Sequence, residues 1–331
     1  MGQSSETHLR RVVLKDGDVS VAILNYGAIT QDWRVPCGGQ RLPVILGYQD
    51  PARYLNDPVY MGAIVGRVAN RTAHGRFTLA GSPIQVSCGY GRHHLHGGPA
   101  GLSTQYWDMD LDQSARKVEL RYHSPDGQQG YPGNIWLNLN IHLSGTRVTY
   151  VMTARSDRLT PLNLAQHNYY NLLGSGPIWS HTLQTNTDRY LPLSADGVPT
   201  GQILKTRGSR NDFTTPTPFE VRDGDHTGHD INLVFAKERA PDDPVAVVRA
   251  PNGLCMRVWS DQPGAQLYTA AHLGQLTGGL DGRSYAPFGG FCLEPQGFPD
   301  ALNHPNFPSI LIDPDRPYRQ VLSVEISEAA Q

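Results

Sequence analysis

The sequence predicts an all-β protein, built as a large and mostly antiparallel sandwich. Apolar residues alternate with polar ones at a period of two in many short segments, whereas no window of a dozen residues has a 3.6-residue period. Gly and Pro are abundant, at 35 and 25 of the 331 residues, so turns must be frequent. These observations favour many strands joined by turns and loops, with at most short helical turns.

The strand signals are spread over the whole chain. Each consists of apolar residues at every second position, the spacing that places them on one face of a strand. The clearest are Val19, Val21 and Ile23; Val118, Leu120 and Tyr122; Ile135, Leu137, Leu139, Ile141 and Leu143; Val148, Tyr150 and Met152; and Leu322, Val324 and Ile326. We predict that these segments are half-buried strands.

Three dipeptides predict hairpins between neighbouring strands. They are Asp16-Gly17, Ala80-Gly81 and Asn252-Gly253, and each lies between two short apolar runs. Asn-Gly is the strongest of these signals, because it suits the two-residue type I′ turn. A short helical turn is expected near Pro51 to Leu55.

Three long segments carry weaker strand signals: residues 155–178, 200–230 and 295–309. Loops of this length in a compact protein are usually functional. We expect them to gather over one face of the sandwich.

Composition and charge narrow the class of ligand. Hydrophobic residues make up 39% of the chain and charged residues 18%, which fits a protein with a large buried core. The net charge is only −2 and Lys and Arg form no run, so neither a nucleic acid nor an anionic membrane is expected as a partner. A neutral small molecule is the easier match. The sequence does not specify an oligomeric state.

Cysteine spacing and the start of the chain indicate a cytoplasmic protein. Cys37, Cys88, Cys255 and Cys292 are far apart and form no CxxC pair, so zinc and redox motifs are unsupported. Residues 1–8 lack the basic and apolar regions of a secretory signal, and no apolar run approaches the ~20 residues of a membrane span. We therefore expect reduced thiols and no export.

The segment that begins at Phe291 places a carboxylate at the end of an apolar strand. Phe291 and Leu293 alternate with Cys292 and Glu294, so when the first pair faces a core, the carboxylate points the opposite way. The proline at position 295 favours an extended backbone at Glu294. A carboxylate held in this way suits a general base that acts on a polyol. The alternative is that Glu294 caps a loop or pairs with an arginine.

Residues 160–172 combine amides, an imidazole and a phenol on one predicted face. Alternation puts Asn163, His167, Tyr169 and Asn171 on one side, and leucines with Tyr170 on the other. Such a polar face suits a sugar, whose hydroxyls need directional partners and whose C–H faces stack on aromatic rings. The alternative is that His167 is a structural histidine with its hydrogen bonds satisfied inside the protein.

His94 and His96 are two residues apart, so on a strand they would share a face. A pair of this kind occurs in cupin-like metal sites, but such a site also needs a Glu a few residues later, where this sequence has residues 97–100, GGPA. We therefore expect no metal here. Instead, one imidazole is expected to hydrogen-bond a ligand, with the glycines letting the backbone come close.

Four other polar residues are candidates for binding hydroxyl groups. Asn70 and Arg71 lie near several glycines, and an arginine can offer a planar fork to two neighbouring oxygens. Asp230 and Gln266 could each bind a hydroxyl. All four could equally be ordinary surface or turn residues.

Taken together, these segments resemble the aldose 1-epimerase family, the galactose mutarotases. The matching blocks follow the family's order and extend from about Asn25 to Pro308. They are residues 66–71 (GRVANR), 95–98 (LHGG), 124–133, 163–172 (NLAQHNYYNL), 188–190, 199–201, 264–269 (GAQLYT) and 293–308. Three neighbours of the key residues depart from the family pattern, and they bring the sugar preference into question rather than the chemistry: His93 and Gln166, where Asn is usual, and Leu102, where an aromatic residue is usual.

The resemblance implies one β-supersandwich domain over residues 1–331 that interconverts the α and β anomers of a free aldose without a cofactor. By motif, Glu294 would be the catalytic base, His167 the acid, and His96 would assist at the ring oxygen. The residues that hold the sugar hydroxyls would be Asn70, Arg71, Asp230 and Gln266.

One carboxylate and one imidazolium suffice for this reaction. Ring opening removes the O1 proton and supplies one to O5, rotation about C1–C2 exposes the other aldehyde face, and closure reverses both transfers. Each positioned proton transfer is worth about 10²–10⁴ in rate. We expect His167 to start protonated and Glu294 to start ionised.

Two other functions fit the same residues. A glycosidase would use two carboxylates, for which Glu294 and Asp230 are the available pair. A non-catalytic sugar-binding protein could be built on the same scaffold. A sugar-phosphate epimerase matches less well, because a dianion would favour more cationic side chains than Arg71 and its neighbours provide.

Overall fold

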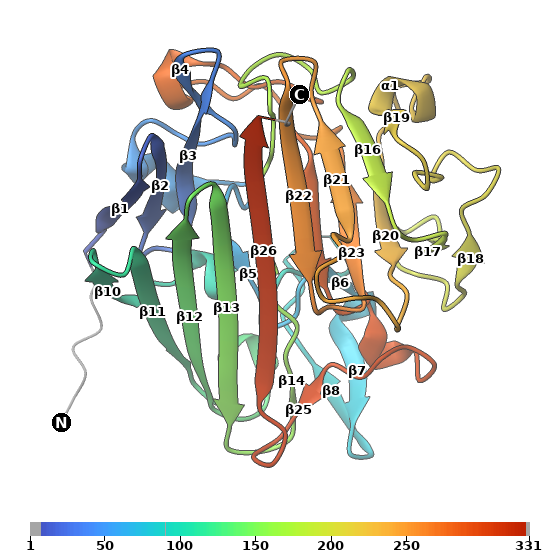
Figure 1. Ribbon diagram of the computed structural model, residues 1–331. Coiled ribbons are helices and arrows are strands. Elements are labelled where there is room, and N and C mark those ends of the chain that lie inside the picture. Colours follow the sequence, from blue (N-terminus) through green and yellow to red (C-terminus); the bar gives the residue numbers. More distant parts are fainter. Residues whose placement is uncertain (1–7, 90, 329–331) are drawn as a thin grey trace.

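The computed structural model describes residues 8–89 and 91–328, which form antiparallel sheets joined by loops and short 3-10 turns. The prediction of an all-β supersandwich is confirmed. Figure 1 shows the largest sheet facing the viewer, with β26 in its middle between β13 and β22. Residues 1–7, which belong to the segment expected to lack a secretory signal, lie outside the described residues.

The largest sheet has nine strands in the order β10-β11-β12-β13-β26-β22-β21-β16-β19. Their bounds are β10 (Asp108–Asp112), β11 (Lys117–Ser124), β12 (Ile135–Ser144), β13 (Arg147–Ser156), β26 (Tyr318–Glu328), β22 (Leu254–Ser260), β21 (Ala246–Arg249), β16 (Thr182–Thr185) and β19 (Thr217–Pro218). The predicted alternation is confirmed in β12, where all five apolar positions are buried and the residues between them are at least partly exposed.

Two smaller sheets share one hydrophobic core with the large sheet. A four-stranded sheet contains β1 (Arg11–Asp16), β2 (Val19–Leu24), β3 (Thr30–Cys37) and β4 (Gln40–Pro43). A five-stranded sheet has the order β18 (Leu204–Lys205), β17 (Arg189–Leu191), β20 (Asp230–Val234), β23 (Gly264–Tyr268) and β24 (Cys292–Gln296). Trp33 of β3, Tyr150 of β13 and Leu267 of β23 belong to the same buried cluster, so all three sheets are packed together.

Short strand pairs and turns connect these sheets. The pairs are β14 (Thr160–Pro161) with β25 (Leu311–Ile312), β15 (Ala165–Gln166) with β5 (Ile64–Val65), β6 (Arg71–Thr72) with β9 (His94–Leu95), and β7 (Arg76–Leu79) with β8 (Ser82–Gln85). The helical elements are α1 (Phe219–Arg222) and the 3-10 turns Pro51–Asn56, Ala73–Gly75, Leu102–Thr104, Gln128–Gly130, Leu280–Gly282 and Ala301–Asn303. The helical turn predicted near Pro51 is confirmed, and Asp50 caps it by accepting from the Ala52 N–H at 3.0 Å.

The three predicted hairpins are confirmed, but the type of one turn is not. Ala80 and Gly81 both have positive φ, +47° and +81°, between the paired residues Leu79 and Ser82, as a two-residue type I′ turn requires. At Asn252-Gly253 the loop is longer, because the Ala250 N–H donates to the Leu254 carbonyl and encloses three residues. The Pro at position 251 explains the difference, since it favours the first central position of a type I turn.

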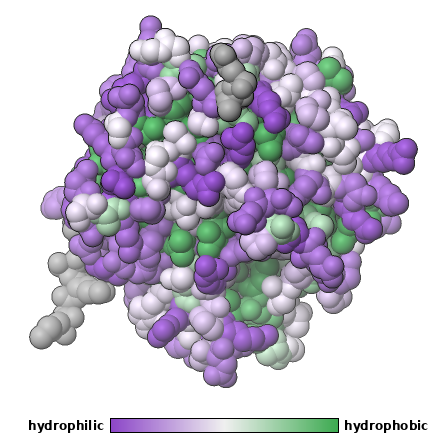
Figure 2. Space-filling model, viewed as in Figure 1, coloured by the Kyte–Doolittle hydropathy of each residue, from purple (hydrophilic) through white to green (hydrophobic). Residues whose placement is uncertain are grey.

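The surface seen in Figure 2 is mostly hydrophilic, with small apolar areas between polar side chains. This agrees with a chain of net charge −2 that carries no run of cations. Among residues 8–89 and 91–328, no helix has the length and apolar character needed to cross a membrane.

The positive φ of Ala80 in this turn can be tested by substitution. A left-handed conformation costs a non-glycine residue roughly 1–2 kcal/mol, so Ala80→Gly should raise the free energy of unfolding by about 0.5–1 kcal/mol after the entropy cost of glycine. Ala115 is exposed and lacks positive φ, so Ala115→Gly should instead lower it by about 0.5–1 kcal/mol. Denaturant unfolding of both variants gives the comparison, and equal destabilisation by the two would contradict the turn.

Candidate active site

The five-stranded sheet has one polar face and one apolar face. Residues that pair directly across antiparallel strands project to the same side, and the register aligns Asn232 of β20 with Gln266 of β23 and Glu294 of β24. The next row aligns Asp230, Tyr268 and Cys292 on that same side. Leucines of the three strands point the other way into the core. The predicted alternation around Glu294 is therefore confirmed.

The wall that faces this sheet comes from short strand pairs. Asn70 precedes Arg71 at the start of β6, and His96 follows the end of its partner β9. His167 follows β15, and its N–H donates to the Ala63 carbonyl at 2.9 Å, which fixes the chain beside the sheet.

These elements enclose a cavity of about 160 Å³. All seven residues that were predicted from the sequence to form the site line this cavity: Glu294, His167, His96, Asn70, Arg71, Asp230 and Gln266. The residues 58–60, Leu95, Tyr169, Tyr268 and His272 complete the lining. The fold thus brings together groups that are up to 224 positions apart in the sequence, from Asn70 to Glu294.

The carboxylate and the imidazole at the centre of the cavity face each other. Oε1 of Glu294 lies 3.8 Å from Nε2 of His167, and the two side chains are only 2% and 6% exposed. The other carboxylate oxygen, Oε2, accepts no hydrogen bond from a described residue, and neither does Oε1 of Gln266 beside it. Both oxygens can therefore accept hydrogen bonds from the hydroxyls of a bound molecule.

Burial opposes the charged form of both groups. Desolvation, with a smaller effect from the charge of Asp230, raises the pKa of Glu294 well above its ordinary value of 4.5. Desolvation lowers the pKa of His167 from 6.5 to about 4. Burial by the protein therefore favours a protonated carboxyl group and a neutral imidazole. This is the opposite of the expected start with His167 protonated and Glu294 ionised.

Hydrogen bonds determine which ring nitrogen of His96 carries the proton. The Asn70 N–H donates to Nδ1 of His96 at 3.2 Å, and the His96 N–H donates to the Asn70 carbonyl at 3.1 Å. Because burial lowers the pKa of His96 well below its ordinary value, the neutral ring carries its proton on Nε2. This leaves Nε2 as a hydrogen-bond donor.

The polar edge of the cavity is held by a charged network. An Arg71 guanidinium nitrogen, Nη1, lies 3.5 Å from Oδ2 of Asp230 and also donates to the Gly197 carbonyl at 3.2 Å. Gln266 donates from Nε2 to Oδ1 of Asp230 at 2.5 Å. Arg71, Asp230 and Gln266 thus present donors and acceptors in fixed directions, which suits the hydroxyls of a sugar.

One wall of the cavity has an unusual backbone. Tyr60, Asn70 and His96 have positive φ, at +58°, +63° and +52°. Such conformations cost non-glycine residues free energy and tend to cluster at functional sites. The sequence did not single out Tyr60, although its ring centroid lies 4.7 Å from that of His96 and 5.9 Å from that of His167. A Tyr in an irregular loop carries no periodic signal that could have identified it.

Some expectations for these segments are wrong. Asn163 and Asn171 do not line the cavity: Asn163 bonds the N–H and carbonyl of Gly297, and Asn171 bonds the carbonyls of Gly176 and Gly289. The segment is not one alternating strand, because β15 ends at Gln166. The side-chain amides of Asn163 and Asn171 therefore hold the loop 155–178 to neighbouring backbone groups.

His94 and His96 do not share a face. The backbone of His96 is in the left-handed conformation, so the strand alternation stops at the end of β9. The imidazole of His94 is instead hydrogen-bonded to the Tyr131 hydroxyl at 2.7 Å. The neighbouring Gly97 has φ +89°, and a Cβ there would lie 1.6 Å from the Gly66 carbonyl oxygen. The glycine is therefore required by the close approach of the protein backbone, rather than by that of a ligand. The three residues that depart from the expected pattern, His93, Leu102 and Gln166, are buried outside the cavity lining.

His167, Cys292 and Glu294 are close enough to be considered as metal ligands, with one atom of each within 4.8 Å of the others. Their directions do not suit one ion. Sγ of Cys292 lies 3.6 Å from Nδ1 of the imidazole, whereas the carboxylate faces Nε2 on the opposite edge of the ring. No single ring nitrogen is directed at both, so this group does not fit the geometry of a zinc site.

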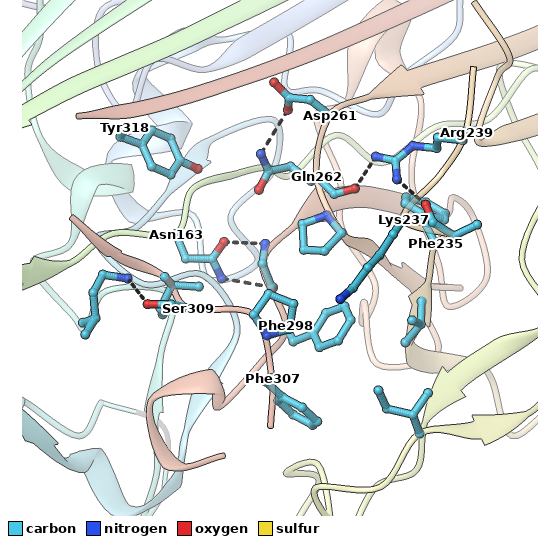
Figure 3. Close-up of a pocket in the computed structure, with 18 of the residues that line it drawn as sticks. Asn163, Phe235, Lys237, Arg239, Asp261, Gln262, Phe298, Phe307, Ser309 and Tyr318 are labelled. Atoms are coloured by element: carbon cyan, nitrogen blue, oxygen red, sulfur yellow. Dashed lines mark hydrogen bonds between the residues drawn. The ribbon is translucent and has the colours of Figure 1, made fainter. Parts of the chain in front are cut away.

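A second and larger cavity, of about 1160 Å³, shares no lining residue with the first (Figure 3). It is lined by aromatic residues such as Phe298 and Phe307, with Lys237 reaching toward them. No histidine is among its described lining residues, so it offers no carboxylate–imidazole pair. The smaller cavity is therefore the candidate active site.

The three long loops contribute unequally to the smaller cavity. The loop 155–178 brings His167 and Tyr169 to the smaller cavity, and the loop 200–230 brings only Asp230. Residues 297, 298 and 306–309 of the third loop line the larger cavity instead. Leu162 and Asn163 of the first loop also line the larger cavity, and the expectation that the three loops share one face of the sandwich stays a prediction.

Known proteins resemble this chain in sequence over most of its length. A family model described as aldose 1-epimerase matches residues 10–325. The galactose mutarotase of Bos taurus is 34% identical over 284 residues, which cover 85% of this chain and 82% of that protein. The aldose 1-epimerase of Escherichia coli K12 is 31% identical over 301 residues, which cover 87% of this chain and 86% of that protein.

Solved structures resemble the fold. An aldose epimerase homologue from C. elegans superposes with a TM-score of 0.92 at 22% identity and covers 98% of this chain and 100% of that chain. A galactose 1-epimerase from Lactobacillus acidophilus superposes with a TM-score of 0.85 at 24% identity and covers 100% of this chain and 98% of that chain.

The buried carboxylate should make stability depend on pH. Because the pKa of Glu294 is raised in the folded state, its ionisation costs stability as the pH rises above 4.5, the ordinary value that applies to the unfolded chain. Glu294→Gln removes this cost, so the Tm of the variant relative to wild type should increase between about pH 4.5 and pH 8. Calorimetry across this range measures it, and a Tm difference that is independent of pH would contradict the assignment.

Proposed function

The chain belongs to the aldose 1-epimerase family, the isomerases that interconvert the α and β anomers of free aldoses, and we propose how its residues perform this reaction. The observation that carries the proposal is the contact of Glu294 Oε1 with His167 Nε2, at 3.8 Å, inside a cavity of about 160 Å³ lined by hydroxyl-binding side chains. An acid and a base thus reach the same small molecule. We propose that residues 1–331 act as one domain, since one buried cluster extends from Leu14 to Ile326.

Glu294 is the catalytic base and His167 the catalytic acid. The carboxylate takes the proton from O1 of the sugar while Nε2 of the imidazolium gives its proton to O5, so the C1–O5 bond breaks and a C1 aldehyde forms. Rotation about C1–C2 turns the other face of the aldehyde toward O5. Closure returns the proton from O5 to His167 and the proton from Glu294 to O1, which leaves the two residues as they began.

The two residues share one mobile proton. Before a sugar binds, this proton lies on the carboxyl group, because burial raises the pKa of Glu294 and lowers that of His167. Sugar hydroxyls that donate to the carboxylate stabilise its ionised form, and the proton then moves to Nε2. Substrate binding itself therefore creates the ion pair that the reaction needs. Since the groups are coupled, their titrations belong to the pair.

The remaining residues hold the sugar in place. His96 donates from Nε2 toward the ring oxygen and supports it as charge develops there. Asn70, Arg71, Asp230 and Gln266 bind the other hydroxyls, and the Arg71–Asp230–Gln266 network fixes their directions. The substrate is a free, uncharged aldose, since Arg71 is the one arginine in the cavity lining among the described residues and Asp230 neutralises it.

No step in this scheme needs a metal or a nucleotide, because ring opening requires only two proton transfers. We also propose a cytoplasmic location, since Cys37, Cys88, Cys255 and Cys292 are free thiols. A glycosidase that uses Glu294 with Asp230, and a non-catalytic sugar-binding protein, are the alternatives that the following assay distinguishes from a mutarotase.

Polarimetry on freshly dissolved α-glucose and α-galactose tests the reaction. The wild-type chain should accelerate mutarotation, and Glu294→Gln or His167→Asn should each lower kcat by about 10²–10⁴-fold while the fold is retained. Nitrophenyl glycosides serve as a control and should not be cleaved. Cleavage without faster mutarotation would support the glycosidase, and sugar binding that persists in a wild-type chain without activity would support the binding protein.

The pH dependence should reflect the shared proton. Activity should fall at low pH, toward about 4, where His167 takes a second proton onto the pair, and again at high pH, where the raised pKa of Glu294 is exceeded and the last proton leaves. The profile of kcat/KM is therefore expected to be bell-shaped. A value of kcat/KM that stays constant from about pH 4 to about pH 9 would contradict the two-group scheme.

A further inference from the structure

The larger cavity has no part in the proposed reaction, and its lining is rich in positive charge. Its volume of about 1160 Å³ is several times the 160 Å³ of the sugar cavity, so it can hold a larger molecule. Five basic residues line it against two acidic ones: Arg189, Lys237, Arg239, Arg316 and Arg319 against Asp188 and Asp261. These cations come from segments far apart in the sequence, so only the fold brings them together.

Carboxylates neutralise three of the five cations. The ion pairs are Arg189 with Asp188 at 3.8 Å, Arg319 with Asp261 at 3.4 Å, and Arg316 with Asp313 at 2.5 Å. Lys237 and Arg239 remain, and neither has a carboxylate partner in the part of the chain that the structure describes. The cavity therefore carries an excess of positive charge at these two residues.

The guanidinium of Arg239 is held in place by groups that do not cancel its charge. It donates to the carbonyls of Ala236, Ser260 and Gln262 at 2.8, 2.9 and 2.6 Å. A carbonyl carries no net charge, and these contacts use three of the five N–H donors of an arginine. The half-buried cation therefore keeps donors for an anion, and because it is already fixed, it loses little conformational freedom when an anion binds.

Lys237 lies two residues before Arg239 and supplies the second free charge. Figure 3 shows its side chain extending into the cavity toward Phe298. The ammonium group is exposed and makes no ion pair or hydrogen bond with residues 8–89 or 91–328. A lysine ammonium and an arginine fork are the side chains that bind phosphate oxygens in proteins. This end of the cavity therefore suits a phosphate group.

The rest of the lining suits a planar ring. Its aromatic residues are Phe235, Phe298, Phe307 and Tyr318. The rings of Phe298 and Phe307 pack edge to face, with centroids 5.2 Å apart. Contact with aromatic side chains stabilises a bound heterocycle, whichever base it is. Because the Lys237 side chain ends beside Phe298 in Figure 3, a ring and its attached phosphates can be bound at neighbouring places.

We propose that the larger cavity binds a nucleotide, with its phosphate groups at Lys237 and Arg239 and its base against Phe298 and the neighbouring aromatic side chains. The excess charge selects an anion, and the aromatic lining selects one that carries a planar ring. The site is separate from the sugar cavity, since the two share no lining residue. It therefore does not depend on the proposed function.

Isothermal titration calorimetry on the full chain, with ADP and UDP as probes, tests the site. At low ionic strength at least one of them should bind with a Kd below about 1 mM, and high salt should weaken the binding. Adenosine and uridine lack the phosphates, and pyrophosphate lacks the ring, so each should bind at least about tenfold more weakly than the nucleotide. If neither nucleotide binds, or if pyrophosphate or the nucleosides bind as tightly, the proposal is wrong.

Substitution of Lys237 locates the phosphate groups. Lys237→Ala should weaken nucleotide binding by about tenfold, the loss expected for one charge-assisted contact, whereas Lys237→Arg keeps the charge and should remain within about threefold of wild type. Lys15 is the matched control, because it is an exposed lysine on β1 outside both cavities. Lys15→Ala should change the affinity by less than about twofold. Equal losses in the two alanine variants would overturn the site.

Arg71→Gln distinguishes the two cavities. Arg71 lines the sugar cavity and not the larger one, so its loss should leave the nucleotide affinity within about twofold of wild type. A loss as large as that of Lys237→Ala would instead place the anion in the sugar cavity and overturn the proposal. Circular dichroism of each variant checks that the fold is retained.

Discussion

The site depends on one electrostatic constraint: a carboxyl group and an imidazole are buried together, and water does not stabilise the charge of either. Glu294 and His167 are each almost fully inaccessible, so the proton they share is placed by the protein and the substrate alone. An exposed pair at the same 3.8 Å separation would be screened and would keep its ordinary pKa values. The enclosing walls are therefore as necessary to the chemistry as the two groups themselves.

The sandwich makes such burial possible by giving the five-stranded sheet two different faces. Its apolar face joins a core that extends through all three sheets, and this burial stabilises the fold. Its other face can then carry Asp230, Gln266 and Glu294 in adjacent rows, although burying Gln266 and Glu294 opposes folding. The left-handed residues Asn70 and His96 on the facing wall add a further cost, which the surrounding hydrogen bonds help to offset.

The local signals in the sequence were reliable where strand geometry alone decides the outcome. The period-two pattern correctly gave the strands of the large sheet, and alternation correctly turned Glu294 away from the core. The same argument failed at residues 163–171, because β15 ends at Gln166 and the chain then follows contacts that are distant in sequence. The side chains of Asn163 and Asn171 are hydrogen-bonded to backbone groups of Gly297 and Gly289. These partners are distant in the sequence, so no local pattern could have revealed them.

By itself, the sequence determined the all-β class, the family blocks and seven of the residues that line the cavity, because strand periodicity and motif order are encoded in consecutive positions. Only the tertiary structure decided that burial reverses the expected charges of Glu294 and His167, and that Cys292 lies against Nδ1. The physical reason is that desolvation and hydrogen-bond direction depend on what packs around a group from every side. That environment is assembled from segments far apart in the chain.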